Sequence, residues 1–254
     1  MLATAIKEWG TLIDLKDKLQ NIHDPASEYT KSAMMDIGRQ VDNTVIASAL
    51  GLAYGGETGA TAVPLTHTQR VASVSSSAIA VPNVAFLRKT KRRFMENKVK
   101  GKVIIAYAAD FLDALLGTTE VGSADYNSVK ALVDGTLDTF MGFKFVHCEE
   151  VGNSAYLADT IDNAAQASGG TEFKYNTSTG LYDASGTALG ATDRTAVAFV
   201  DNSAVILGEN TGGRKSEVGP RPDKRYDQQI YVCRDMGATR IEEVQVVHMI
   251  YKAS

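Results

Sequence analysis

The sequence predicts an α+β protein built around one long helix. Three observations support this fold class: an uninterrupted helical pattern over residues 24–50, mixed helical and strand patterns over residues 82–146, and short apolar segments typical of strands towards the C-terminus. No unit of about 20 to 50 residues repeats along the chain, which excludes solenoid and propeller architectures.

The long helix is expected to span residues 25–50. Asp24 can accept hydrogen bonds from the first free N–H groups, Pro25 suits the first helical position, and Gly51 can end the helix. Apolar residues recur at every fourth position and form a stripe that drifts slowly around the helix axis: Tyr29, Ala33, Ile37, Val41, Val45 and Ala49. With a rise of about 1.5 Å per residue, the helix is about 40 Å long and suits a platform across a protein face.

The remaining elements follow from shorter patterns. Residues 6–12 are expected to be extended, and the glycine-rich residues 51–77 to form a loop with short strands such as 61–65. Helices are expected over 82–98, over 110–116 and from 123 or 125 to about 133, with strands over 102–107 and 140–146. A hairpin is expected over 175–182, and further strands over 196–200, 204–207 and 241–251.

The composition is that of an ordinary globular protein. The 254 residues are 44% hydrophobic and 22% charged, which argues against disorder, and no apolar run approaches the roughly 20 residues of a membrane-spanning helix. The first residues lack the pattern of a secretion signal. Cys148 and Cys233 lie far apart in the sequence and are expected to be reduced, structural thiols.

One segment is strongly basic. Between Arg88 and Lys102 there are eight lysine and arginine residues against Glu96 alone, so this segment carries +7 and the rest of the chain −11 of a total of −4. Such a segment is either a solvated face or a surface that meets phosphates or an acidic neighbour. Because Phe94 is the one interleaved aromatic residue, stacking on nucleic-acid bases is not favoured. The candidate contact residues are Arg88, Lys89, Lys91, Arg92, Arg93 and Lys98.

No combination of residues indicates an enzyme or a metal site. Residues 208–216 resemble a phosphate-binding loop, but Arg214 separates Lys215 from the preceding glycine, and prolines follow where that motif requires a helix. The four histidines are scattered, and His147 and Cys148 would point to opposite faces of a strand. Adjacent carboxylates diverge in the same way, so neither catalytic residues nor a cofactor are expected.

Several segments are informative together, through their order and spacing. They are Asp24-Pro25-x-Ser27-x-Tyr29, Arg39-x-x-Asp42-x-x-Val45-Ile46, the glycine-rich residues 51–59, Arg92-Arg93-Phe94-Met95-Glu96-Asn97-Lys98-Val99, Ser123-x-Asp125-Tyr126, Gly142-Phe143-x-Phe145, Pro220-Arg221-Pro222-Asp223-Lys224 and Met236-Gly237-Ala238-Thr239-Arg240. In this order the segments resemble the major capsid proteins of tailed bacteriophages. The resemblance covers residues 15–250, with a gap at residues 152–195.

The resemblance implies a Hong Kong 97-like fold with two domains. Residues 25–148 and 236–254 would form a peripheral (P) domain with the helix 25–50 as its spine. Residues 149–235 would form an axial (A) domain that meets its copies around five- and six-fold axes. The change to small polar residues near Val151 falls at the same boundary. Residues 1–24 would be an N-terminal arm, or the remnant of the hairpin (the E-loop) that family members carry before the spine helix.

The implied function is structural. The chain would self-assemble as hexamers and pentamers into an icosahedral phage head that encloses double-stranded DNA, with assembly in the host cytoplasm and neither a membrane nor a small-molecule partner. Scaffolding, portal and decoration proteins would be further partners. Head-to-tail ring contacts suit a loop over 208–227 in which charges of both signs mix: Arg214, Lys215, Glu217, Arg221, Asp223, Lys224 and Arg225.

Two alternatives stay open on the sequence alone. An encapsulin-like shell would have the same fold but store an enzyme, and a monomeric nucleic-acid-binding protein would use the basic helix 88–102. Particles that contain nucleic acid or protein cargo distinguish the two shells. A small, monodisperse species with salt-dependent DNA affinity would favour the monomer.

Overall fold

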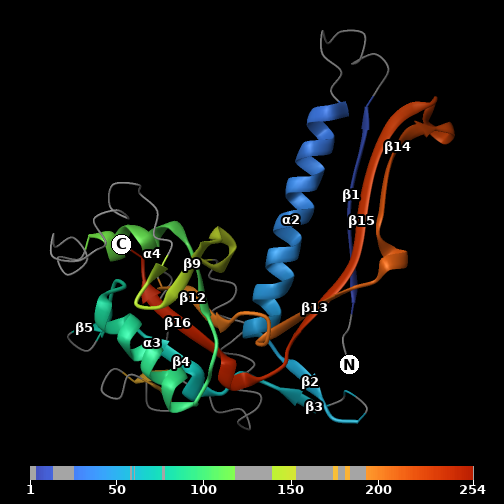
Figure 1. Ribbon diagram of the computed structural model, residues 1–254. Helices are drawn as coiled ribbons and strands as arrows, with labels where there is room; N and C mark the ends of the chain where they lie inside the picture. Colours follow the sequence, from blue (N-terminus) through green and yellow to red (C-terminus); the bar gives the residue numbers. More distant parts are fainter. Residues whose placement is uncertain are drawn as a thin grey trace. The chain divides into compact units, whose positions relative to one another are not determined.

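The fold is described from a computed structural model of the chain (Figure 1). The described residues are 4–13, 26–57, 59, 61–75, 78–117, 139–152, 174–176, 181–183 and 193–253. The chain divides into two compact units. The larger unit comprises Ile46–Ile206 and Thr239–Ser254, and the smaller unit comprises Leu2–Val45 and Leu207–Ala238.

A mixed sheet forms the centre of the larger unit. Its strand order is β4-β16-β12-β7-β9-β8; the pairs β16–β4 and β7–β9 are parallel, and the other pairs are antiparallel. The strands are β4 (Arg70–Ala72), β7 (Val103–Tyr107), β8 (Thr139–Phe140), β9 (Phe143–His147), β12 (Asp193–Val200) and β16 (Val246–Lys252). Strands β12 and β16 are buried along almost their whole length, as expected for central strands that are covered on both faces.

Two helices, α3 (Val84–Glu96) and α4 (Ala109–Leu116), pack on one face of this sheet. Phe111 of α4 is fully buried and joins them. The centroid of its ring lies 6.5 Å from that of Phe86 in α3, 6.0 Å from that of Tyr107 in β7 and 5.3 Å from that of Tyr251 in β16. Because aromatic pairs at such distances add to the stabilisation from apolar burial, this cluster fixes both helices to the sheet.

Short elements complete the larger unit. They are the pairs β2 (Ala53–Gly55) with β3 (Thr61–Val63), β5 (Val74–Ser75) with β6 (Ala78–Ile79) and β10 (Lys174–Asn176) with β11 (Leu181–Asp183), and the 3-10 turns η1 (His67–Gln69), η2 (Glu149–Gly152) and η5 (Glu243–Gln245). The hairpin predicted over 175–182 is confirmed by β10 and β11. The short strand predicted over 61–65 corresponds to β3.

The compact units do not follow the predicted division into residues 25–148 with 236–254 and residues 149–235. Strand β12, expected in the axial domain, lies between β7 and β16, which were expected in the peripheral domain. The change of composition near Val151 therefore marks a segment within one unit, not a boundary between units. Pairing between strands that are distant in sequence leaves no trace in composition, so the compact units could not be foreseen from it.

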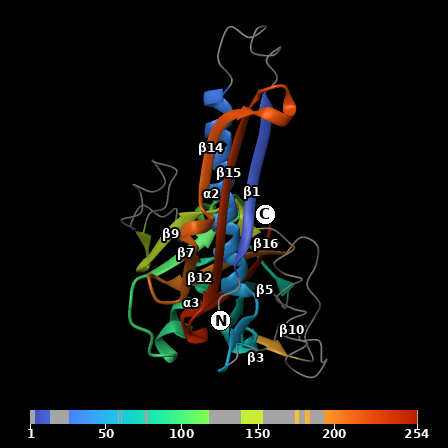
Figure 2. The same cartoon turned by 90° about the vertical axis from the view of Figure 1, so that its right-hand side faces the viewer.

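The smaller unit combines a helix with an antiparallel sheet. Helix α2 (Ala26–Leu50) contributes its residues up to Val45, and the sheet consists of β1 (Ala5–Ile13), β13 (Val205–Glu209), β14 (Lys215–Arg221) and β15 (Asp227–Arg240). Figure 2 shows β15 between β14 and β1. Burial of Ala33 and Ile37 on the helix, and of Ile13 and Ile230 on the strands, places a small core between the helix and the sheet.

The span predicted for the long helix, residues 25–50, is confirmed by α2. Gly51 ends the helix: its N–H donates to the carbonyl of Ala47 at 2.7 Å, and a Cβ on Gly51 would lie 2.7 Å from the same oxygen. The predicted apolar stripe is buried only in part. Tyr29 is exposed, whereas Ala33 and Ile37 are buried, because a four-residue repeat drifts off the face of a helix that turns every 3.6 residues.

The other predicted elements are largely confirmed. Elements β1, α3, β7, α4, β9, β12, β13 and β16 stand where the sequence predicts strands and helices, and β1 occupies part of the predicted N-terminal arm. The helix predicted from residue 123 or 125 lies outside the described residues. Strands β14 and β15 were not predicted.

Strand β16 buries a histidine in the centre of the larger unit. His248 pairs in register with Arg70 of β4 and with Val197 of β12. Among the described residues, neither of its ring nitrogens has a hydrogen-bond partner. Burial first, and then the charge of Arg70, hold the pKa of His248 well below its usual value of 6.5. His248 is therefore neutral in the folded chain at neutral pH.

The stability of the chain is expected to fall as the pH is lowered below about 6.5. The unfolded chain binds a proton at His248 near this pH and the folded chain does not, so the free energy of unfolding decreases by up to about 1.4 kcal/mol per pH unit. Urea denaturation between about pH 5 and pH 7.5 measures this slope. His248→Leu cannot titrate and should flatten it; equal slopes in both proteins would contradict the assignment to His248.

Candidate assembly surfaces

The basic segment folds as helix α3 because both of its ends are capped. Asn83 precedes the helix in an extended conformation, and its side-chain oxygen accepts a hydrogen bond of 2.8 Å from the N–H of Phe86. At the other end, Lys98 adopts a left-handed backbone with φ of 55°, and the N–H of Val99 donates to the carbonyl of Phe94 at 3.0 Å. This is the closing hydrogen bond of a Schellman motif, which ends a helix.

The predicted basic residues gather on the outer side of α3. The inner side is buried and consists of Phe86, Leu87, Thr90 and Phe94. The outer side carries the exposed Arg88, Lys89, Lys91 and Arg92 and the half-buried Arg93, with the exposed Lys98 just beyond the helix. Glu96 pairs with Arg92 at 2.7 Å and with Arg93 at 3.2 Å. Within the part of the chain that the structure describes, Arg88 has no ionic partner, so this side keeps a net positive charge.

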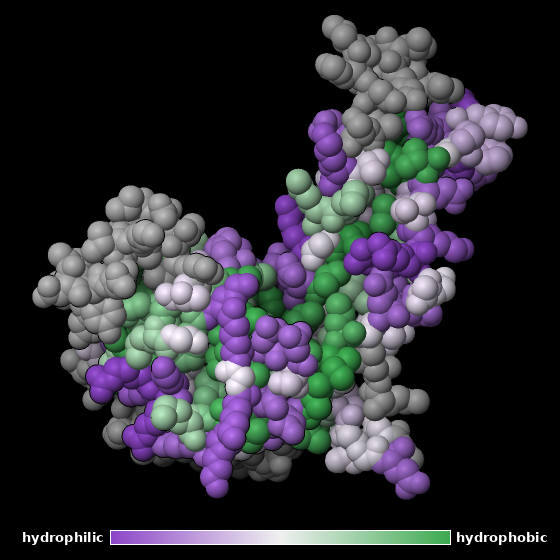
Figure 3. Space-filling model, viewed as in Figure 1, coloured by the Kyte–Doolittle hydropathy of each residue, from purple (hydrophilic) through white to green (hydrophobic). Residues whose placement is uncertain are grey.

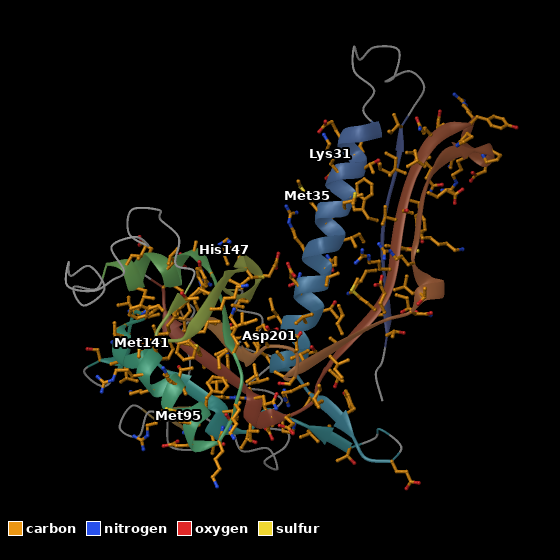
Figure 4. The ribbon with its side chains drawn as sticks, in the orientation of Figure 1. Lys31, Met35, Met95, Met141, His147 and Asp201 are labelled. Atoms are coloured by element: carbon orange, nitrogen blue, oxygen red, sulfur yellow. The ribbon has the colours of Figure 1, made fainter. Side chains whose placement is uncertain are left out.

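A shallow hollow of about 470 Å³ lies on the outer side of α3. Its lining consists of Arg88, Lys91, Arg92, Met95 and Glu96 of the helix and Met141 of the β8–β9 turn. Figure 4 shows the Met95 and Met141 side chains on this side of the larger unit, and Figure 3 shows hydrophilic surface around them. This surface, the methionine hollow, combines an apolar floor with a mostly cationic rim.

The sequence did not predict the methionine hollow. Met141 reaches α3 only through the turn between β8 and β9, in which Met141 and Gly142 adopt positive φ angles of 54° and 85°. The ammonium of Lys91 donates to the carbonyl of Met141 at 2.7 Å and so fixes the turn to the helix. The sequence predicted one strand over residues 140–146, so it missed both the turn at Met141-Gly142 and its contact with a helix 50 residues earlier.

The second candidate surface, predicted as a loop over 208–227, is a hairpin in the smaller unit. Its candidate residues Arg214, Lys215, Glu217, Arg221, Asp223, Lys224 and Arg225 lie on or beside β14 and the 3-10 turn η4 (Pro222–Lys224). The strand β14 was not expected within this loop, and it pairs only with β15 among the described strands. A proline is tolerated on such an edge strand because its missing N–H faces outwards.

A hollow of about 420 Å³ lies along β14 and β15. Glu217 faces Tyr231 across the strand pair, and Gly219, which has no side chain, faces Gln229. The hydroxyl of Tyr231 donates to Glu8 of β1 at 2.8 Å, and this hydrogen bond is the first cause that raises the pKa of Tyr231 to about 12. A side-chain hydrogen bond thus joins the neighbouring strands β15 and β1.

The tip of this hairpin is an exposed turn with an unusual backbone. Arg225 and Tyr226 both have positive φ angles, of 54° and 63°, and Tyr226 is 66% exposed. Residues other than glycine and asparagine rarely adopt this backbone conformation. It occurs in hairpin turns because it matches the twist of the paired strands. The ion pair of Arg221 with Asp223, at 2.7 Å, lies beside the turn and lowers the pKa of the Asp223 carboxyl.

The described residues contain no group of three or more histidine, cysteine or acidic side chains that could hold a metal ion. None of the described helices is long and apolar enough to span a membrane. In residues 208–216 the 3-10 turn η3 (Thr211–Gly213) leads directly into β14, where a phosphate-binding loop requires a helix.

A family model described as phage capsid protein matches residues 1–252, nearly the whole chain. The chain belongs to the phage capsid protein family. The major capsid function implied by the sequence resemblance is thereby confirmed, and the protein is a structural component of a phage head.

Solved phage capsids share the fold of this capsid protein. A chain of the capsid of cyanophage P-SCSP1u aligns with a TM-score of 0.64 at 14% identity, over 100% of this chain and 74% of that chain. A chain of the cyanophage Pam1 capsid aligns with a TM-score of 0.62 at 13% identity, over 99% of this chain and 75% of that chain. The fold is therefore the expected Hong Kong 97-like capsid fold.

An encapsulin also shares this fold. A chain of the holo-SrpI encapsulin complex from Synechococcus elongatus aligns with a TM-score of 0.51 at 10% identity, over 98% of this chain and 73% of that chain. No curated protein sequence matches the capsid protein.

Proposed function

We propose that this capsid protein self-assembles as hexamers and pentamers into an icosahedral shell around double-stranded DNA. The observation that carries the proposal is the family match over residues 1–252. Rings of identical subunits need one surface that complements a different one, and the chain carries a basic side on α3 and a hairpin of mixed charge. Its work is geometric and not catalytic, and it is carried out in the virion after assembly in the host cytoplasm, with scaffolding, portal and decoration proteins as further partners.

The two compact units correspond in this proposal to the two domains of the fold. The smaller unit is assigned to the peripheral domain because it holds most of the spine helix α2. The larger unit, with its sheet and the helices α3 and α4, is assigned to the axial domain that meets its copies around the ring axes.

Both candidate surfaces are assigned to contacts between subunits. The hairpin of β14 and β15 presents mixed charges and the exposed Tyr226 at its tip, which suits contacts between subunits. The outer side of α3 is assigned to a neighbouring subunit and not to DNA, because packaged DNA slides most freely along a neutral or acidic lining. Aromatic platforms for bases are also missing from the described outer side of α3.

Expression of the wild-type chain tests this function. Electron microscopy of the purified protein is expected to show closed shells. Particles isolated from a phage infection are expected to contain DNA that is protected from nuclease. Shells that instead retain a protein cargo would support the encapsulin alternative. The Synechococcus encapsulin shares the fold of this chain. A monodisperse monomer with salt-dependent DNA affinity would contradict the proposal.

A further inference from the structure

The methionine hollow has an unbalanced charge and an uncovered apolar floor. Met95 is 70% exposed, although methionine side chains are usually covered in folded proteins. Of the cations on its rim, Arg92 is paired with Glu96, while Lys91 contacts only the neutral carbonyl of Met141 and Arg88 has no ionic partner in the described ranges. The hollow therefore suits a partner surface that offers carboxylates around an apolar side chain.

The same unit carries an acidic surface around the first turn of α4. Glu149 of η2 accepts a hydrogen bond of 3.0 Å from the N–H of Ala109, which brings its carboxylate to the start of the helix. Asp113 follows one turn later, is exposed, and has no cation paired with it among the described residues. Asp110 of the first turn pairs with Arg194 at 3.9 Å, and Glu149 also lies 3.4 Å from Nε2 of His147, so Asp113 is the carboxylate of this surface that is free of such a partner among the described residues. We call Asp113 and Glu149 the acidic corner.

We infer that the methionine hollow of one subunit docks the acidic corner of a second copy of this chain. The inference rests on the proposed self-assembly and deepens it by naming the two surfaces of one contact. Because the two surfaces differ, the contact is head-to-tail. Repetition of the contact generates a ring when the rotation from one subunit to the next is a whole fraction of a full turn. Opposite charges steer the two surfaces together, and removal of Met95 and Met141 from water stabilises the contact.

Charge complementarity within the chain favours a second copy over DNA as the occupant. The segment between Arg88 and Lys102 carries +7 and the remaining residues −11, so the rest of every subunit has an excess of carboxylates that a cationic rim can meet. A phosphate backbone would neutralise Arg88 and Lys91 but would leave the methionine floor in contact with water or with charged oxygens. A protein surface can satisfy both the rim and the floor.

Exchange of charges across the contact tests the inference. Arg88→Glu and Asp113→Lys are each expected to raise the protein concentration needed for association about tenfold, because each places like charges opposite one another. An equimolar mixture of Arg88→Glu and Asp113→Lys should recover association, because the hollow of each variant then meets a complementary corner on the other. Such alternation closes rings with an even number of subunits, such as hexamers, but not pentamers. The double variant should recover association alone. Sedimentation velocity measures the associated fraction in each case.

Lys100→Glu, an exposed cation of the same unit that does not line the hollow, controls for the change of net charge. Met95→Ala tests the apolar floor: it should weaken association while the thermal unfolding of the subunit stays unchanged, since Met95 is exposed in the single chain. Cysteines introduced at positions 88 and 113 should also give covalent oligomers with a short bismaleimide, whether or not shells close.

The outcomes separate this inference from the proposed function. Normal shells from Arg88→Glu or Asp113→Lys, or a mixture and a double variant that fail to associate, would overturn the inference and leave shell formation standing. Normal shells of Arg88→Glu that have lost DNA would assign the hollow to nucleic acid and overturn it as well. Cross-linked oligomers without shells would support the contact and contradict the proposed shell. A chain with neither shells nor cross-links would overturn both.

Discussion

Replacement of Arg240 by alanine is expected to lower the free energy of unfolding of the chain by about 4 kcal/mol. Arg240 is 5% exposed, and its guanidinium donates to the carbonyls of Ala49 and Gly51, both at 2.9 Å, and to that of Val63 at 3.0 Å. Hydrogen bonds from a charged donor contribute about 1.5 to 3 kcal/mol each, and their loss would leave buried acceptors without partners.

The position of Arg240 adds an electrostatic contribution. Ala49 lies in the last turn of α2, where the free carbonyls give the helix end a partial negative charge that a nearby cation stabilises. Burial lowers the pKa of the Arg240 guanidinium, and Glu243 partly offsets this shift. The side chain stays charged at neutral pH because the pKa of arginine starts far above it.

Urea denaturation of three variants separates these causes. Arg240→Met keeps the side-chain volume but loses the donors, and should be almost as unstable as Arg240→Ala. Arg240→Lys keeps the charge, but its single nitrogen cannot bridge all three carbonyls, so it should recover only part of the loss. The exposed Arg214→Ala should change stability by less than about 0.5 kcal/mol. A small effect of Arg240→Met would contradict the role given to the hydrogen bonds.

Phe111→Ala is expected to destabilise the larger unit by about 4 kcal/mol. Phe111 is fully buried and contacts the rings of Phe86, Tyr107 and Tyr251, so its removal leaves a cavity bordered by two helices and two strands. Alanine is the better helix former, so the loss reflects packing and not the helix propensity of α4.

Graded substitutions at this position test the packing argument. Phe111→Leu fills most of the volume and should cost about 1 to 1.5 kcal/mol. Met95→Ala, which removes an exposed side chain in the same unit, should change the free energy of unfolding by less than about 0.5 kcal/mol. Equal losses for the leucine and alanine variants at 111 would show that the cavity is not the cause.

Most individual elements could be predicted from the sequence, because local signals mark them. Asp24-Pro25 and Gly51 bracket α2, and the continuous apolar run of Val103, Ile104 and Ile105 marks β7. Strand β15 could not be predicted: its deeply buried side chains include Ile230, Cys233 and Met236, spaced by three, where a strand with one buried face would alternate by two.

The candidate surfaces were predicted only in part, for a similar reason. Charge counting found the basic side of α3, which is local in sequence. The methionine hollow includes Met141, which comes from a turn 50 residues after Lys91. The guanidinium of Arg240 donates hydrogen bonds to carbonyls more than 170 residues earlier, from Ala49 to Val63. Contacts between distant parts of a chain depend on strand pairing, which composition and periodicity do not encode.

The central claim is that this capsid protein acts by associating with copies of itself. Sedimentation velocity of the purified wild-type chain at micromolar concentration tests it most directly. The account predicts that fast-sedimenting closed particles coexist with little free subunit. A single species with the mass of one 27.2 kDa chain, unchanged by protein concentration and salt, would contradict it.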